Sequence, residues 1–442
     1  MHCYLPASDG AQSMTQTSDI FDGLLSNLQI DNSESISSRR DEITRVLNLD
    51  FRDSESTTSN RLMVGSYGRR TAIKGISDLD LLYLLPSGLR STYESDGGPA
   101  KVLSRTRQTI QNRYPSTSVK VDRLVVVVEF TNFVFEVQPV FENSDASFSY
   151  PDTYVDSWKV TKPRAEISAT ADMETISGGS LRVLCKLTRA WRNKHGAVMG
   201  GLLVDTLACN YLDDYKNHHN VDSESYDLLF RDFLLFLSEQ IDHDFYLALG
   251  SRQHVKVKKK FQKKAKKGYD LCEEAIDAAG QSNAYKKWRK VFGNSVPIVA
   301  GDAKETGVTK TWTDSEEFVE DVYPVDIRHT VEIDCIVTQD GFRPQSLRSL
   351  LKSSLRLQAQ KNLSFAVLST SVVEPFDVRW KVLNQGPEAE RRDKIRGQIV
   401  KSTSKRERRE VTNFRGDHYV ECYIIKNGVV VARDDINVPI TT

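Results

Sequence analysis

The segment from Gly65 to Asp80, Gly-Ser-Tyr-Gly-Arg-Arg-Thr-Ala-Ile-Lys-Gly-Ile-Ser-Asp-Leu-Asp, constrains the fold more than any other part of the chain. Asp78 and Asp80 stand one residue apart at the start of an apolar run. Because the side chains of a strand alternate between its faces, both carboxylates would share one face while Leu79 and Leu81 enter the core. The spacing therefore predicts a strand that carries an acidic pair on its open face.

This acidic pair predicts a metal site. Two like charges so close repel by about 1 to 4 kcal/mol, depending on the effective dielectric, so positive charge is expected between them. Mg²⁺ binds through one or two carboxylates and keeps water and phosphate oxygens as its other ligands. Gly65 and Gly68 permit a turn that presents backbone N–H groups to phosphate, and Ser66 adds a hydroxyl. The pattern is typical of metal-dependent nucleotidyl transfer; the plainer alternative is a tight turn before a strand with a solvent-facing Asp pair.

A third carboxylate is expected on a neighbouring strand. The runs 124–130 and 133–140 are rich in β-branched and aromatic residues and predict a hairpin. Glu136 lies inside the second run, with Phe133 and Phe135 on the opposite face, and a carboxylate there is costly unless it is paired or binds a metal. Glu129, in the first run, is the competing candidate and is the one expected at the surface.

Residues 65–86 and the sequence Glu136-Val137-Gln138-Pro139 resemble the cyclic GMP-AMP synthase/DncV-like nucleotidyltransferases of bacteria (CD-NTases of the SMODS type). The similarity extends over about residues 19–298 and includes a helix at 181–192 and the closing segment 288–293. It implies an α+β fold with a polymerase-β-like palm and a helical lobe. It also implies synthesis of a cyclic di- or trinucleotide from nucleoside triphosphates (ATP, GTP or others) in antiphage (CBASS-type) defence, with the product acting on a downstream effector.

The resemblance assigns two Mg²⁺ ions, for which Mn²⁺ can substitute, to Asp78, Asp80 and Glu136. The family often has Asp in place of Glu136. A turn at Gly65 and Ser66 is expected to hold the triphosphate together with a helix cation, which is either Lys186 or Arg189, since residues three apart share a helix face. The family usually has Lys at position 189. Each cation has the alternative of lying on an ordinary solvated helix face.

The family often has Ser after this helix. Here the chain reads Met199-Gly200-Gly201, which carries no side-chain hydroxyl for the triphosphate.

Pattern divides the chain into domains. Residues 1–18 predict a flexible tail, and Met14 is an alternative start. A nucleotidyltransferase domain follows at 19–298, with the palm at about 50–160 and the helical lobe at about 165–298. Helices are expected at 19–30, 33–48, 98–113, 228–240 and 269–279, and strands dominate 62–140. Residues 299–320 predict a linker.

Residues 321–442 predict a C-terminal all-β, sandwich-like domain. Short alternating strands are expected at 329–337, 363–368, 377–383, 418–425 and 429–432, with a hairpin turn at 426–428. Segments 323–328, 379–386, 395–397 and 418–423 resemble the adenylyl/guanylyl and SMODS C-terminal (AGS-C) sensor domain, which implies ligand sensing and control of the cyclase. Trp380 and His418 are expected to pack inside. Seven arginines there predict either a phosphate-binding surface or a solvated edge: Arg391, Arg392, Arg396, Arg406, Arg408, Arg409 and Arg415.

The charge is balanced, with 60 basic and 60 acidic residues, so attraction for nucleotides must be local. Segment 252–267 carries nine Lys and Arg and no Asp or Glu, which predicts either a contact surface for RNA or a loop running into an exposed helix. An RNA or other phage-derived activator is expected at this segment or at the C-terminal domain. Six scattered cysteines without Cys-x-x-Cys pairs, and no apolar stretch of about 20 residues, predict a cytoplasmic protein that does not span a membrane.

Other functions share these motifs. A transferase that tails RNA or adenylylates a protein would use the same turn and carboxylates, and a non-catalytic nucleic-acid sensor would only bind nucleotide.

Overall fold

The computed structural model describes residues 9–76, 78–281, 283–298, 317–339, 343–353, 355, 357–384, 387–393, 397–402, 406–412 and 415–441. The chain forms two compact units. Unit 1 comprises Met1–Leu24, Ala190–Met199 and Lys259–Thr442, and unit 2 comprises Leu25–Arg189 and Gly200–Lys258. This division runs across the transferase domain predicted at 19–298, whose ends belong to the same unit as the C-terminal domain.

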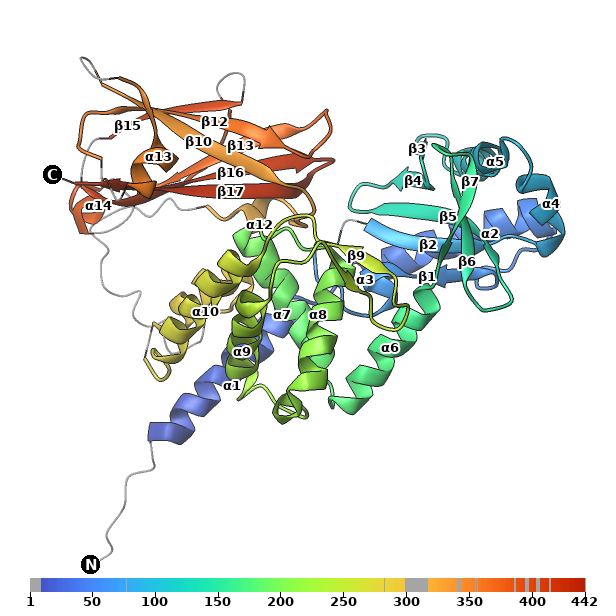
Figure 1. Ribbon diagram of the computed structural model, residues 1–442, viewed down its shortest axis with the longest axis horizontal. Coiled ribbons are helices and arrows are strands. Elements are labelled where there is room, and N and C mark those ends of the chain that lie inside the picture. The colour runs from blue at the N-terminus through green and yellow to red at the C-terminus, as the bar shows by residue number, and fades with distance from the viewer. Residues whose placement is uncertain are drawn as a thin grey trace, which may run out of the picture. The chain divides into compact units, whose positions relative to one another are not determined.

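Unit 2 is built on a seven-stranded sheet with the order β1-β2-β5-β4-β3, and β6 and β7 extend it from β5 (Figure 1). Strands β2 and β5 run parallel, and the other pairs are antiparallel. The strand bounds are β1 (Arg61–Met63), β2 (Asp78–Leu84), β3 (Ser118–Asp122), β4 (Val125–Glu129), β5 (Val134–Glu142), β6 (Phe148–Asp152) and β7 (Ser157–Thr161). The predicted strands within 62–140 are confirmed.

One face of this sheet packs on helices α2 (Ser33–Arg52) and α5 (Gly98–Arg113), which confirm the helices predicted at 33–48 and 98–113. Leu79 and Leu81 of β2 lie in this core with 0% and 1% exposure. The alternation of β2 then leaves Asp78 and Asp80 on the opposite face, where both side chains are half-buried.

Helices form the rest of unit 2, together with a two-stranded hairpin, β8 (Phe245–Leu247) and β9 (His254–Lys256). The helix bounds are α3 (Gly65–Gly68), α4 (Arg90–Tyr93), α6 (Pro163–Ile176), α7 (Ser180–His195), α8 (Gly201–Asp214) and α9 (Tyr226–Glu239). The predicted helix 228–240 corresponds to α9.

Unit 1 begins with α1 (Asp9–Asn27), so a helix starts inside the expected tail 1–18, of which residues 1–8 lie outside the described residues. Burial of its apolar face accounts for the helix. Phe21 is fully buried and meets Trp288 of α11 (Ala284–Phe292) with ring centroids 4.9 Å apart. Helix α10 (Gln262–Ile276) packs on α11 and begins earlier than the predicted 269–279. The predicted linker 299–320 falls mostly outside the described residues.

The C-terminal part of unit 1 contains two four-stranded antiparallel sheets, ordered β11-β10-β12-β15 and β14-β13-β16-β17. They share one core, in which Trp380 and Phe365 are fully buried, so the sandwich-like domain is confirmed. Asn427 and Gly428 have φ of 51° and 76°, as the predicted hairpin turn requires. The bounds are β10 (Val331–Thr338), β11 (Gln345–Ser346), β12 (Asn362–Thr370), β13 (Asp377–Leu383), β14 (Ile399–Lys401), β15 (Glu407–Val411), β16 (Gly416–Lys426), β17 (Val429–Ile440), α12 (Val319–Val322), α13 (Leu347–Lys352) and α14 (Pro387–Arg391).

Contacts explain why the end of α7 belongs to unit 1. The Arg192 guanidinium meets the carboxylate of Asp326 at 2.6 Å, and both groups are largely buried. The Asn193 side chain donates to the carbonyl of Val325 at 2.6 Å and accepts from the N–H of Ile327 at 3.2 Å. Polar groups buried this way are satisfied only while the C-terminal domain is folded against them.

Most of the C-terminal arginines are paired with carboxylates. Arg391 and Arg392 bind Glu388, and Arg408 binds Glu410 at 2.7 Å. Arg406 binds Glu374, Arg409 lies 3.9 Å from Glu407, and Arg396 lies outside the described residues. These pairs favour the solvated edge over the phosphate-binding surface.

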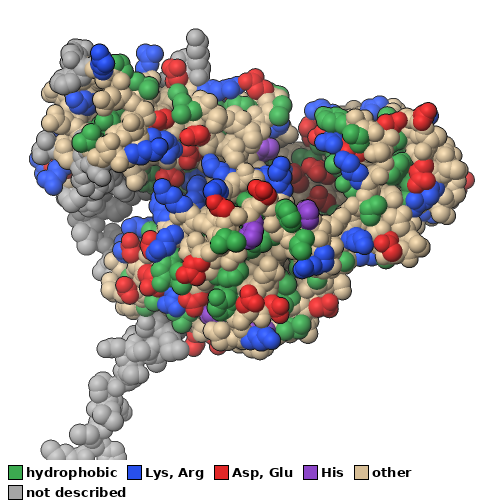
Figure 2. Space-filling view, in the orientation of Figure 1, with side chains coloured by type: hydrophobic (Ala, Val, Ile, Leu, Met, Phe, Trp, Pro, Cys, Tyr) green, Lys and Arg blue, Asp and Glu red, His purple; other side chains and the backbone are tan. Residues whose placement is uncertain are grey.

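The face in view in Figure 2 shows Lys and Arg side chains interspersed with Asp and Glu, as the balanced composition suggests. Over the described part of the chain, none of the helices combines the length and the apolar character that a membrane span needs.

Candidate active site

Strands β2 and β5 bring two of the predicted carboxylates side by side. Their parallel register sets Asp80 opposite Glu136 and Asp78 opposite Val134. Leu79 and Phe135, which alternate with the acidic residues, are both fully buried on the other face. Asp78, Asp80 and Glu136 therefore share the open face of the sheet.

The surroundings of Glu136 disfavour its negative charge. Burial, followed by the charges of Asp80 and Asp122, raises the pKa of Glu136 to about 7. Asp122 lies two strands away, on β3. Its neighbour Lys120 is in line with Glu136 across the sheet, and Asp122, two residues later, shares that face. A cation at this face would reverse the effect, because opposite charge favours the ionised carboxyl group.

Glu129, the competing candidate, lies at the far end of β4 opposite Ser118. Its carboxylate is 3.4 Å from the ammonium group of Lys120. The structure therefore places Glu136, and not Glu129, next to Asp80.

The Gly-Ser turn lies directly against Asp80. Gly65 has φ of +62°, and a Cβ atom there would lie only 1.9 Å from Oδ2 of Asp80. The N–H of Val64 donates to the carbonyl of Asp80 at 3.0 Å, which fixes the turn to strand β2. Ser66, half-buried at the start of this turn, is thus held within one residue of the carboxylate contact.

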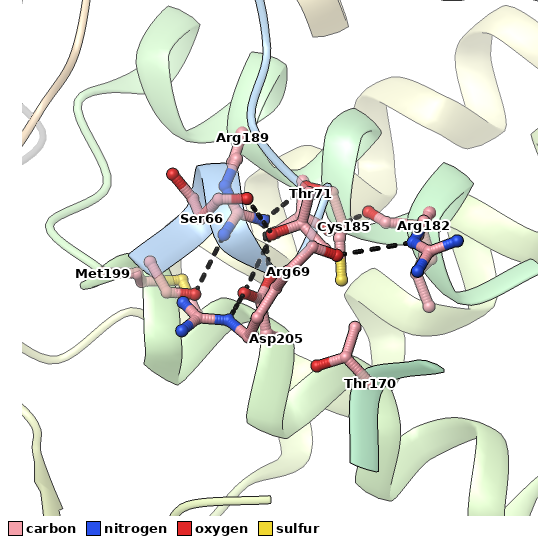
Figure 3. Close-up of polar contacts among 12 residues, drawn as sticks. Ser66, Arg69, Thr71, Thr170, Arg182, Cys185, Arg189, Met199 and Asp205 are labelled. Atoms are coloured by element: carbon pink, nitrogen blue, oxygen red, sulfur yellow. Dashed lines mark hydrogen bonds and ion pairs between the residues drawn. The ribbon is translucent and has the colours of Figure 1, made fainter. Parts of the chain in front are cut away.

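A buried ion cluster anchors the turn to the helices (Figure 3). Asp205 of α8 is fully buried and lies 2.8 Å from Nε of Arg69 and 2.6 Å from Nη1 of Arg189. The hydroxyl of Thr71 donates to the same carboxylate at 3.0 Å. Although burial acts to raise it, the charges of Arg189 and Arg69 hold the pKa of Asp205 below its usual value. The segment that follows Ser66 is therefore fixed by charge inside the protein.

The two candidate triphosphate cations on α7 have different surroundings. Arg189 is 3% exposed, and besides Asp205 its guanidinium binds the carbonyls of Cys185 and Gly201 at 3.2 and 3.1 Å. Lys186 is half-buried, and burial lowers the pKa of its ammonium group. Within the described residues, Lys186 forms neither a hydrogen bond nor an ion pair. The guanidinium of Arg189 is thus engaged by Asp205 and two backbone carbonyls, whereas the ammonium group of Lys186 is not.

The carboxylate oxygens do not converge as closely as predicted. Among the residues that the structure describes, no three His, Cys, Asp or Glu side chains lie close enough together to hold a metal ion. The strand register brings Asp80 and Glu136 together, but like charges on neighbouring side chains repel. The predicted metal site thus has its three carboxylates on one face without their oxygens forming a ready ligand set.

The basic segment 252–267 divides between two environments. Its first part forms β9, whereas Lys264 lies in α10 and donates to the carbonyl of Gly196 at 3.1 Å. Phe261 is 1% exposed. This is neither a simple loop nor a uniformly solvated helix.

Sequence reasoning missed Arg69, Glu166 and Asp205. A signal was present for Asp205, which stands between Leu203-Val204 and Leu207-Ala208, since a carboxylate in an apolar helix face needs a partner. The sequence did not predict which residue pairs with Asp205, because Arg69 lies 136 residues away in the chain.

Comparisons with known proteins identify two domains in the chain. The family model of the Second Messenger Oligonucleotide or Dinucleotide Synthetase (SMODS) domain matches residues 14–173, and that of the Adenylyl/Guanylyl and SMODS C-terminal sensor domain matches residues 313–441. A cyclic AMP-AMP-AMP synthase from Acinetobacter sp. is 22% identical over 262 residues, which cover 53% of this chain and 71% of that protein.

Two solved structures are also similar. Escherichia coli MS115-1 CdnC, in a complex with HORMA-deltaN, has 14% identity and a TM-score of 0.46, covering 65% of this chain and 98% of CdnC. Vibrio cholerae DncV cyclic AMP-GMP synthase, in complex with a linear intermediate, has 13% identity and a TM-score of 0.45, covering 64% of this chain and 88% of DncV. With the two domain models matched in this order, the chain belongs to the cyclic GMP-AMP synthase/DncV-like nucleotidyltransferases, as a cyclic oligonucleotide synthase that carries an AGS-C sensor domain.

Proposed function

We propose that this enzyme joins nucleoside triphosphates into a cyclic di- or trinucleotide at the open face of β2 and β5. The observation that carries the proposal is the pairing of Asp80 with Glu136 directly beneath Gly65. This geometry sets two carboxylates next to a turn that suits phosphate, as metal-dependent nucleotidyl transfer requires.

The donor chemistry of these residues fits a divalent cation, around which their oxygens would have to draw together. Asp78, Asp80 and Glu136 supply the hard oxygen ligands that Mg²⁺ or Mn²⁺ prefers. Burial, followed by the charges of Asp80 and Asp122, raises the pKa of Glu136, and a bound cation would lower it again. Mg²⁺, when bound there, would acidify a ribose hydroxyl and neutralise the charge on the departing pyrophosphate.

The protein's own side chains position the triphosphate. Ser66 follows the Gly65 contact with Asp80, so its hydroxyl and the backbone N–H groups of this turn are assigned to the triphosphate, and Lys186 is assigned as its positive charge. The Arg69–Asp205–Arg189 cluster keeps the turn in place, so little reorganisation is needed when substrate binds. A linear intermediate that turns round at the same face would undergo a second attack and close the ring.

We further propose that the product acts on a downstream effector in antiphage defence and that the AGS-C domain controls synthesis. The match to the sensor-domain model supports this assignment. The ion pair of that domain with Arg192 and its hydrogen bond with Asn193, both on α7, also support it.

The proposal is tested with labelled triphosphates, Mg²⁺ or Mn²⁺ and candidate RNA, followed by phosphatase treatment and mass spectrometry. Asp78→Ala with Asp80→Ala, and separately Glu136→Ala, should abolish the phosphatase-resistant product. Glu129→Ala is the matched control and should retain it. Products that lengthen RNA or label a protein would replace ring synthesis by tailing or adenylylation, and full activity of Glu136→Ala would overturn the metal site.

A further inference from the structure

The β8–β9 hairpin presents an unusual surface within unit 2. In its antiparallel register Phe245 pairs with Lys256 and Leu247 pairs with His254, and these four side chains share one face. All four are exposed, with Phe245 at 42% and Leu247 at 36%. Tyr246 and Val255 point the other way and are half-buried. The exposed face thus combines an apolar centre with positive charge.

The rings on this face already stack. The rings of Phe245 and His254 are parallel within 18°, with centroids 3.7 Å apart. Arg252, Lys256 and Lys258 are all exposed along the same segment. Asp242 and Asp244, just before β8, offset part of this charge, so ring stacking rather than charge would contribute most of the affinity.

We propose that this face of the hairpin binds single-stranded nucleic acid, with a base stacked on Phe245 and His254 and phosphates contacting Arg252 and Lys256. Aromatic platforms flanked by cations bind single strands because every base has a flat π face and every linkage carries a negative charge. A duplex hides its bases, and a protein partner would not require the cations.

The hairpin is rigidly joined to the turn that carries Ser66. Its loop packs on α6, since a Cβ atom at Gly250 would lie 2.1 Å from the carbonyl oxygen of Ala165. The Ser251 hydroxyl donates to Glu166 at 2.9 Å, and the other oxygen of Glu166 lies 3.5 Å from Nη1 of Arg69. A strand bound on the hairpin would therefore bias the position of the turn, and this regulatory consequence, unlike the binding itself, rests on the proposed function.

Binding is measured by fluorescence anisotropy of a labelled 20-nucleotide oligouridine with the full chain. Phe245→Ala and Phe245→Leu should both weaken binding about ten-fold or more, and Phe245→Trp should restore it, because stacking needs a ring and not only apolar area. Tyr154→Ala, at an aromatic residue that is 75% exposed and lies beside Arg123, is the matched control and should bind normally. Two phosphate contacts, at Arg252 and Lys256, predict a slope of about −1.4 for log K against log salt.

Equal affinity of Phe245→Leu and the parent protein would overturn the proposal, as would equal loss in Tyr154→Ala or tighter binding of a matched duplex. The Ser251→Ala variant should bind oligouridine normally, but bound oligouridine should no longer change its rate of cyclic nucleotide synthesis, as it should in the parent protein. Because binding is measured without triphosphates, it can fail while synthesis succeeds, and the reverse, so the two proposals are tested separately.

Discussion

Gly65→Ala isolates the contact on which the active site depends. A Cβ atom at position 65 would lie 1.9 Å from Oδ2 and 3.0 Å from Cγ of Asp80, whereas non-bonded heavy atoms keep about 3.5 Å apart. The carboxylate must then move by more than 1 Å, and a displacement of roughly 1.6 Å would relieve the contact fully. A misplacement of about 1 Å costs on the order of 100-fold in rate.

The same substitution also strains the backbone, because φ at Gly65 is +62° and a left-handed conformation costs about 1–2 kcal/mol for an L-residue. Gly179→Ala is the matched control. Gly179 has φ of +98°, and no atom lies within 4 Å of the Cβ position there, so that variant carries backbone strain alone.

Product formation is measured by mass spectrometry and unfolding by thermal denaturation. We expect both variants to lose a similar, small amount of stability, whereas only Gly65→Ala loses about 100-fold or more in rate. Equal activity of the two variants would refute the close approach of the turn to Asp80.

Three further predictions concern the cluster, the carboxylates and the helix cation. Asp205→Asn leaves two buried guanidinium groups short of their counter-charge and should cost about 3–5 kcal/mol, seen as faster hydrogen exchange at residues 65–72; unchanged exchange would contradict the cluster's role. Because the pKa of Glu136 is raised to about 7, its carboxyl group contributes stability at low pH that is lost as the pH rises through 7. Mg²⁺ should therefore raise Tm more at pH 8 than at pH 6, and Glu136→Gln should remove this difference. Equal Tm shifts at the two pH values in the parent protein would contradict this prediction. Lys186→Ala should raise KM for triphosphate and leave Tm unchanged, whereas Arg189→Met should lower Tm. A raised KM with unchanged Tm in Arg189→Met, and a lowered Tm in Lys186→Ala, would instead make Arg189 the phosphate-binding cation.

Local sequence patterns predicted the structure correctly where the residues of one segment determine its conformation. The ranges of α2 and α5, the strand at Asp78–Leu84 and the turn at 426–428 follow from periodicity and turn residues, which act over a few positions. The tail was predicted wrongly for Asp9 onwards, because α1 is stabilised by packing on a partner more than 260 residues later in the chain, such as Trp288.

By itself the sequence determined which residues make up the candidate site: an acidic pair on one strand face, a glycine turn able to approach it, and a carboxylate inside a second apolar strand. Only the tertiary structure decided that β5 lies parallel to β2 with Glu136 opposite Asp80, and that Arg189 pairs with the buried Asp205. The physical reason is range. Side-chain alternation repeats every two residues, whereas strand pairing and the choice of ion partners depend on burial and charge summed over segments far apart in the chain.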